Sequence, residues 1–182
     1  MLFAALLAVL PALAQAGNTI SGHATVYYDL TNSLCGNNDP FPSNWAETSG
    51  INSGIPYCEF HASPGKSLAE LGTNRIVAVN ATAMNLDAAS LCGKQVAIKD
   101  ASGNEFSFSE GPLFIWDACD AARTVPIVDL SAKAFSELKG NTCSGNNPTG
   151  LTISIMDNNI WQPISKRDEK PRVRSRHFAQ LD

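Results

Sequence analysis

Leu113-Phe114-Ile115-Trp116-Asp117-Ala118-Cys119 is an apolar run that leads into a carboxylate, and Val128-Asp129-Leu130-Ser131 follows it after a loop. Consecutive apolar residues in such a short run are typical of a buried strand. Ser131 is a good N-cap, so it predicts a helix from Ala132 to Leu138 that ends near Gly140. A carboxylate at the end of a buried strand makes Asp117 the first candidate for a functional residue.

Short strands separated by turn-rich loops are predicted for most of the chain. They are rich in β-branched and aromatic residues. A turn at 100–103 is expected to join two of them as a hairpin, and Ser67-Leu68-Ala69-Glu70 has the form of a capping box. Together the strands predict an all-β, small closed barrel with one or two short helices. The six predicted strands are 23–28, 75–80, 95–99, 105–108, 113–116 and 151–156.

The N-terminal residues 1–16 are expected to be a signal peptide. An uncharged apolar run from Leu2 to Leu13 is followed by Ala14-Gln15-Ala16, the small-residue pattern of a cleavage site. The run is shorter than the roughly 20 residues that span a bilayer. We therefore expect a secreted, extracellular protein without a membrane segment. The sequon at Asn80 is then an expected glycosylation site.

Charge divides the chain into an acidic domain, residues 17–163, and a basic tail, residues 164–182. The domain holds seven Lys and Arg against fourteen Asp and Glu, and the tail holds six against three. An acidic domain repels phosphate backbones, which argues against a nucleic-acid partner. The tail lacks apolar periodicity and is predicted to be disordered. It is either a solvated terminus or, at Lys166-Arg167 and the arginines after it, a processing site or a contact for acidic polysaccharide.

Five well-separated cysteines in an exported chain indicate disulfides rather than zinc ligands. One cysteine of the five stays free or pairs between chains. The preferred pairs are Cys119 with Cys143, and Cys92 with either Cys35 or Cys58. Cys35 and Cys58 would also hold the long loop 34–64, a candidate binding segment. The histidines His23, His61 and His177 are too scattered to be metal ligands, so neither a metal nor another cofactor is expected.

Six segments of the chain resemble, in order, the RlpA-like double-psi β-barrel family, which includes the first domain of expansins, barwin-like proteins and small secreted fungal proteins. The resemblance covers about residues 21–161 and implies a disulfide-stabilised, six-stranded double-psi β-barrel with a groove across one face. The six segments are Gly22-His23-Ala24-Thr25-Val26-Tyr27-Tyr28-Asp29, Leu34-Cys35-Gly36, Ile76-Val77-Ala78-Val79-Asn80, Cys92-Gly93-Lys94, Trp116-Asp117-Ala118-Cys119 and Val128-Asp129-Leu130-Ser131-Ala132-Lys133-Ala134-Phe135.

The resemblance also implies which residues line the groove. Asp117 and Thr25 match groove positions of wall-active members, and Tyr27, Tyr28 and Trp116 are expected beside them. The chain departs from the family in two respects. A second cysteine is missing after Cys119, and no segment matches the His-Phe-Asp of plant expansins, so unaided wall loosening of the plant kind is not implied.

Two interpretations of Asp117 remain open. Beside apolar neighbours its carboxyl would be partly desolvated, which raises its pKa and suits a general acid. Cleavage of a glycan would also need a second carboxylate about 5–10 Å away, for which Asp29, Asp120 and Asp157 are candidates. Alternatively, Asp117 accepts hydrogen bonds from loop amides and orders the turn at Cys119. Asp129 is predicted to cap the nearby helix start or its preceding turn.

The function predicted first is binding of cell-wall polysaccharide without hydrolysis, by a monomer. One alternative is an extracellular interaction protein, such as a cysteine-protease inhibitor or an effector. Another is a lytic enzyme that uses Asp117 as general acid. Aromatic residues of the long loop would stack on sugar rings, dock on a partner protein or cover one end of the barrel. They are Phe41, Trp45 and Tyr57.

Overall fold

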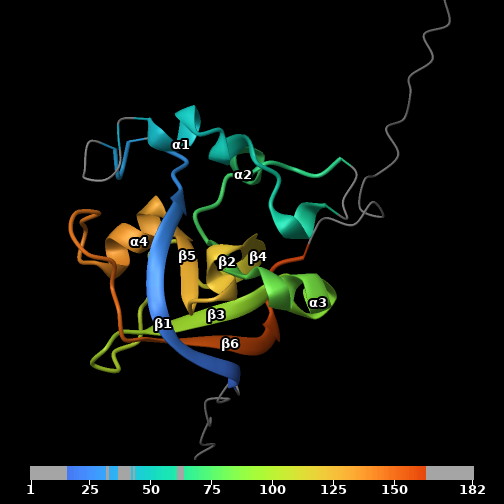
Figure 1. Ribbon diagram of the computed structural model, residues 1–182, viewed down its shortest axis with the longest axis vertical. Helices are drawn as coiled ribbons and strands as arrows, with labels where there is room; N and C mark the ends of the chain where they lie inside the picture. Colours follow the sequence, from blue (N-terminus) through green and yellow to red (C-terminus); the bar gives the residue numbers. More distant parts are fainter. Residues whose placement is uncertain (1–15, 32, 37–41, 43, 61–63, 163–182) are drawn as a thin grey trace, which may run out of the picture.

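Six strands form a closed barrel in the computed structural model, which describes residues 16–31, 33–36, 42, 44–60 and 64–162 (Figure 1). Two neighbouring pairs, β1 with β5 and β2 with β4, are parallel, and the other pairs are antiparallel. The six-stranded barrel implied by the resemblance is confirmed. Around the barrel the strands are β1 (Ala16–Tyr28), β5 (Ile127–Ser131), β2 (Ile76–Asn80), β4 (Leu113–Cys119), β3 (Lys94–Lys99) and β6 (Leu151–Asn159).

One of the six predicted strands, 105–108, was wrong. Residues 105–108 do not form a strand, and Ile127–Ser131 completes the barrel instead. The Asp100 side chain closes the turn after β3 by accepting bonds from the backbone N–H groups of Ser102 and Asn104, both at 2.8 Å. Beyond the turn, pairing with β3 is limited to one bridge at Glu105 and one bond from the Phe106 amide to the Ile98 carbonyl.

Helices and short 3-10 turns occupy the connections. Two helices were predicted correctly: α2 begins at a capping box on Ser67, and α4 begins at Ser131, whose hydroxyl accepts a bond from the Ala134 amide at 3.1 Å. Helix α3 was not predicted. The elements are α1 (Trp45–Thr48), η1 (Ile51–Ser53), η2 (Tyr57–Glu59), α2 (Leu68–Leu71), α3 (Ala81–Leu91), η3 (Ala121–Arg123) and α4 (Ala132–Leu138).

Asn80, the sequon residue, is the N-cap of α3. Its Oδ1 accepts a bond from the Ala83 amide at 3.1 Å, and its Nδ2 donates to the Ala122 carbonyl at 2.7 Å. A glycan on Nδ2 would have to be accommodated beside the Ala122 contact. Glycosylation of Asn80 therefore stays a prediction, and the intact mass of the secreted protein tests it.

Large side chains that are almost fully buried fill the barrel. Trp116 is 1% exposed, and its indole N–H donates to Oε1 of the buried Glu59 at 3.0 Å. Tyr28 is fully buried, and its hydroxyl donates to the Thr73 carbonyl at 2.8 Å. The prediction that Tyr28 and Trp116 line a groove was therefore wrong, because both belong to the core.

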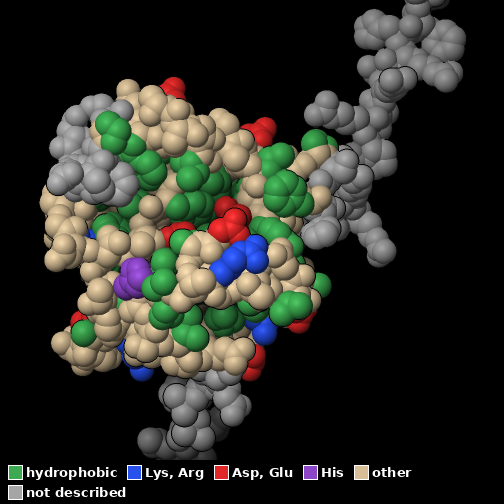
Figure 2. Space-filling model, in the orientation of Figure 1, with side chains coloured by type: hydrophobic (Ala, Val, Ile, Leu, Met, Phe, Trp, Pro, Cys, Tyr) green, Lys and Arg blue, Asp and Glu red, His purple; other side chains and the backbone are tan. Residues whose placement is uncertain are grey.

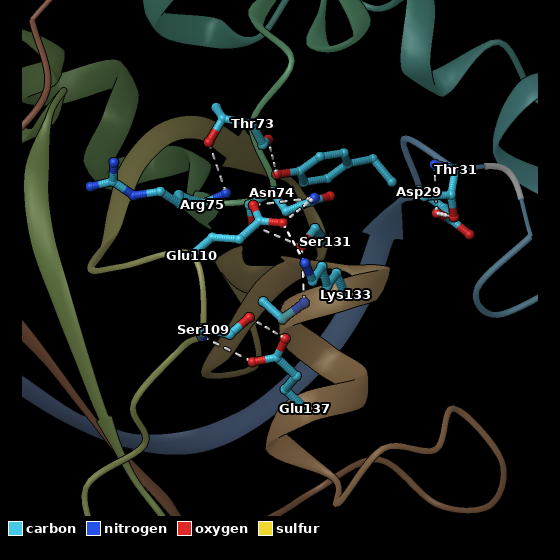
Figure 3. Close-up of polar contacts among 12 residues, drawn as sticks. Asp29, Thr31, Thr73, Asn74, Arg75, Ser109, Glu110, Ser131, Lys133 and Glu137 are labelled. Atoms are coloured by element: carbon cyan, nitrogen blue, oxygen red, sulfur yellow. Dashed lines mark hydrogen bonds and ion pairs between the residues drawn. The ribbon is translucent and has the colours of Figure 1, made fainter.

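Polar contacts fix the end of β5 and the start of α4 against the rest of the barrel (Figure 3). Ser131 donates its hydroxyl to the Asn74 carbonyl at 2.7 Å. Lys133 pairs with Glu110 at 2.7 Å, and Glu137 accepts bonds from the amide and hydroxyl of Ser109. These contacts hold the strand that carries Asp129.

Two disulfides are formed, Cys35–Cys143 and Cys58–Cys92. The pairing of Cys92 with Cys58 confirms one of the two expected alternatives, but the predicted pair Cys119–Cys143 is wrong. Cys119 is a buried free thiol that packs with Ala78 and Ala122, whereas the chain after α4 brings Cys143 to Cys35. Both disulfides tie the long segment after β1 to other parts of the domain.

No helix in the described part of the chain is long and apolar enough to cross a membrane. The expected signal peptide, apart from Ala16, and the expected basic tail lie outside the described residues, as do Phe41, His61 and His177.

Candidate functional site

Four strands bring a threonine and two carboxylates into one row across the barrel. Thr25 on β1 is the register partner of Asp129 on β5, and Asp129 is the partner of Ala78 on β2. Ala78 also pairs with Asp117 on β4. We call Thr25, Asp129, Ala78 and Asp117 the acidic row. Neighbouring strands lie about 4.8 Å apart, so the row extends over about 14 Å, with a small alanine between its two carboxylates.

Asp129 is the central carboxylate of the row. It accepts a hydrogen bond from the Thr25 hydroxyl, and the Cys119 thiol lies near it. Burial raises the pKa of Asp129, an effect opposed by the Cys119 thiol and by the nearby charge of His23. The sequence prediction that Asp129 caps a helix start or turn missed this position, because Ser131 caps α4 and Asp129 bonds across to β1.

Asp117 is partly structural and partly available. Its Oδ1 accepts bonds from the backbone N–H groups of Tyr57 and Ala118, both at 2.8 Å, so the interpretation that it orders a loop is correct for this oxygen. The side chain is nevertheless half-buried rather than sealed. Burial raises the pKa of Asp117 and the charge of Asp129 adds to the rise, against the opposing effect of the two backbone donors.

Tyr27 covers the row from β1. It follows Thr25 on β1, at the irregularity in register between Val26 and Tyr28. It packs against Ala78 and Cys119, and its buried hydroxyl lies near Asp117 but outside ordinary hydrogen-bond geometry. Burial, with the charges of both carboxylates, raises the pKa of Tyr27, so it keeps its proton at neutral pH. Tyr27 thus lies near Asp117, and its role in a groove stays a prediction.

The three carboxylates considered as partners for Asp117 are engaged elsewhere. Asp29 is 2% exposed and accepts bonds from Thr31 and from the Leu34 amide. Asp120 pairs with Arg123 at 2.8 Å, and Asp157 lies 3.7 Å from Lys94 on the exposed end of β6. Asp129 is therefore the second carboxylate of the site. Asp129 reaches the site because β5 pairs in parallel with β1. The alternating pattern of residues 127–131 gave no signal of this pairing, since the two strands are far apart along the chain.

The site is an open surface rather than an enclosed chamber. Figure 2 shows hydrophobic side chains in the middle of one face, with acidic and basic side chains next to each other beside them, below the α1–α2 segment. Residues of the acidic row line neither the hollow against β3 nor the hollow against the α1–α2 segment. An open, acidic surface with aromatic neighbours suits an extended polar ligand better than a small molecule. Among the described residues, no group of His, Cys, Asp and Glu could hold a metal ion.

We predict that the Cys119 thiol is protected from alkylation in the folded protein. It is 7% exposed, and burial together with the neighbouring Asp129 raises its pKa to about 11. At pH 8, labelling by iodoacetamide should be at least about 100-fold slower than in urea, since the thiolate is the reactive form. Mass spectrometry of time points measures both rates. Equal rates with and without urea would show that the thiol is accessible.

We predict that Asp129→Asn and Asp117→Asn each raise the free energy of unfolding at pH 7. Because burial raises the pKa of each carboxyl, the folded state holds the proton more tightly than the unfolded state. Each carboxyl thus favours folding in acid, and this contribution is lost as the pH rises through the raised folded pKa. The advantage of the Asn variants should be largest at pH 7 and shrink towards pH 4.

Urea unfolding at both pH values measures this difference. Asp157→Asn is the matched control, because its side chain is 67% exposed and pairs only weakly with Lys94. An advantage of the two row variants that is equal at pH 4 and pH 7 would contradict the effect of burial on their pKa values.

Comparisons with known proteins add little beyond the fold. No protein-family model and no curated protein matches the chain. Among solved structures, an apo expansin of Clavibacter michiganensis matches with 20% identity and a TM-score of 0.42 over 80% of this chain. A mutant expansin of that organism in complex with cellohexaose matches with 19% identity and a TM-score of 0.39, also over 80% of this chain. The chain spans 54% of each of those chains, and likeness at this level says nothing about what it binds.

Proposed function

We propose that this chain binds an extracellular polysaccharide along the acidic row, without needing to cleave it. The observation that carries the proposal is the row itself, in which Thr25, Asp129 and Asp117 line up on neighbouring strands beside Tyr27. Carboxylates are strong acceptors for the hydroxyl donors that cover a glycan. The row is also long enough to meet more than one sugar ring of an extended chain.

The resemblance to RlpA-like barrels supports a polysaccharide of the cell wall as the ligand class. The two disulfides fit an oxidising, extracellular location, as do the proposed signal peptide of residues 1–16 and mature domain of residues 17–163. A monomer with the basic tail 164–182 outside the barrel remains part of this proposal. The inhibitor alternative calls for a projecting rigid loop within residues 34–64. The part of this loop at Tyr57 and Cys58 is held to Asp117 and Cys92, so rigidity alone does not separate the two functions, and retention on polymers does.

A specific observation favours acid-assisted cleavage as a second candidate. Asp117 and Asp129 flank Ala78 on opposite sides, so their Cα atoms are two strand spacings, about 9–10 Å, apart. Inverting glycosidases need two carboxyl groups about 6.5–9.5 Å apart, with one of raised pKa as the acid, and side chains on alternate strands of one row can reach such a separation. Burial raises the pKa of both carboxyl groups, which is the direction that a general acid needs.

Retention on insoluble polymers tests the proposal. Cellulose, chitin and peptidoglycan are each incubated with the wild type, with Asp129→Asn and with the Asp157→Asn control, and the released reducing ends are measured alongside. We expect the wild type and the control to be retained on at least one polymer and Asp129→Asn to be lost from it, without sugar release. Failure of the wild type on all three polymers would overturn the proposal. Sugar release that depends on Asp117 and Asp129 would establish the lytic function instead.

A further inference from the structure

An exposed aromatic turn lies at the end of the acidic row. Phe60, directly after η2, is 66% exposed, and Ile55 before it is 44% exposed. The ring of Tyr57, which is half-buried, meets the Phe60 ring edge-on, with centroids 6.1 Å apart and planes at 87°. The turn therefore presents an apolar surface to solvent.

This turn is attached directly to the row. The Tyr57 backbone N–H donates to Oδ1 of Asp117 at 2.8 Å, so the backbone that carries the aromatic rings is joined to the end of the row. A ligand that follows the row past Asp117 would therefore meet the rings of Tyr57 and Phe60 next.

The base of the turn is rigid. Cys58 is bonded to Cys92, and the buried Glu59 binds the indole N–H of Trp116 at 3.0 Å and the Lys66 amide at 3.1 Å. Four contacts therefore fix the backbone of the turn that carries the exposed rings. They are the disulfide, the bonds of Glu59 to the indole and to the Lys66 amide, and the bond of the Tyr57 amide to Asp117. Holding a binding surface in place before the ligand arrives lowers the entropy cost of binding.

We propose that Tyr57 and Phe60 form a stacking subsite for a pyranose ring, which extends the glycan-binding row; this inference rests on the proposed function. A pyranose ring has an apolar C–H face that suits an aromatic ring, and its rim hydroxyls suit the carboxylate of Asp117 beside it. The exposed surface of Ile55, Tyr57 and Phe60 is too small for a stable protein interface, which buries about 800 Å² on each partner. A sugar ring matches its size.

Isothermal titration with cellohexaose and chitohexaose tests the subsite. Phe60→Ala should weaken binding of the accepted oligosaccharide about 3- to 12-fold, whereas Phe60→Tyr should restore it. Leu86→Ala is the matched control, because Leu86 is an apolar side chain on α3 that is 83% exposed. Phe60 is exposed too, so its removal should leave the circular dichroism spectrum and the unfolding midpoint unchanged.

The outcomes separate the subsite from the proposed function. If Phe60→Ala binds the oligosaccharide more weakly, while Phe60→Tyr and Leu86→Ala bind it with nearly the wild-type affinity, the subsite is supported. If Phe60→Ala binds as the wild type does while Asp129→Asn does not, the subsite is overturned and the proposed function stands. If the wild type binds neither oligosaccharide and is retained on no polymer, the proposed function fails and the subsite with it.

Discussion

Removing the Cys35–Cys143 disulfide with the pair Cys35→Ala and Cys143→Ala is expected to lower the free energy of unfolding by about 4–5 kcal/mol. The two cysteines are 108 residues apart, and the chain-entropy estimate of the stabilisation grows with the length of the closed loop. A loss of this size is a large part of the total stability of a typical domain, about 5–15 kcal/mol. Urea unfolding measures it.

The second disulfide provides an internal comparison. Cys58 and Cys92 are 34 residues apart, so the same estimate gives about 3–4 kcal/mol for their double substitution. The free thiol provides a control, because Cys119→Ala opens no covalent loop. It should lower the free energy of unfolding by less than the removal of either disulfide does. Peptide mapping that joins Cys119 to Cys143, or a loss below about 1 kcal/mol on removing Cys35–Cys143, would contradict the observed connectivity.

Asp129→Asn is expected to weaken oligosaccharide binding by about 10- to 150-fold. Hydrogen bonds to a charged group contribute about 1.5–3 kcal/mol, and the substitution removes the charge while it keeps an acceptor for the Thr25 hydroxyl. Isothermal titration with the oligosaccharide that the wild type accepts gives the two dissociation constants. Loss of affinity should accompany the gain in stability at pH 7, because the buried charge serves binding and opposes folding.

The control for this prediction is Asp157→Asn, which makes the same chemical change on the exposed end of β6. If both substitutions weaken binding equally, net charge rather than the row governs affinity. If Asp129→Asn binds as tightly as the wild type, Asp129 is not part of the binding surface.

The local patterns predicted most strands but could not distinguish true barrel strands from isolated extended segments. Residues 105–108 alternate like a strand, yet Asp100 closes the turn so that little pairing with β3 follows. Helix α3 was missed because its sequence has no clear apolar stripe, and its backbone is interrupted at Asp87. Its start depends on Asn80, which the sequence pattern indicated as the end of a strand and as a glycosylation site.

The candidate site was predicted in part. Thr25, Tyr27 and Asp117 lie near one another, but the meeting of Asp129 with Thr25 depends on a parallel register between strands about a hundred residues apart, which no local pattern encodes. Tyr27 and Tyr28 are adjacent at an irregularity of β1, where their rings meet edge-on with centroids 4.8 Å apart, so simple alternation did not decide which of them is buried. Trp116 and Ile115 before it are both buried, so β4 also departs from alternation beside Asp117.

The most direct test of the central claim is a titration of the isotope-labelled protein with the accepted oligosaccharide, followed through the backbone amide resonances. Binding along the acidic row predicts that the largest shifts fall on Thr25, Ala78, Asp117 and Asp129, with the amide of Tyr57 next and those of β3 and β6 least affected. Shifts centred on β3, β6 or the turn at 100–104, with the four amides of the row unchanged, would contradict it.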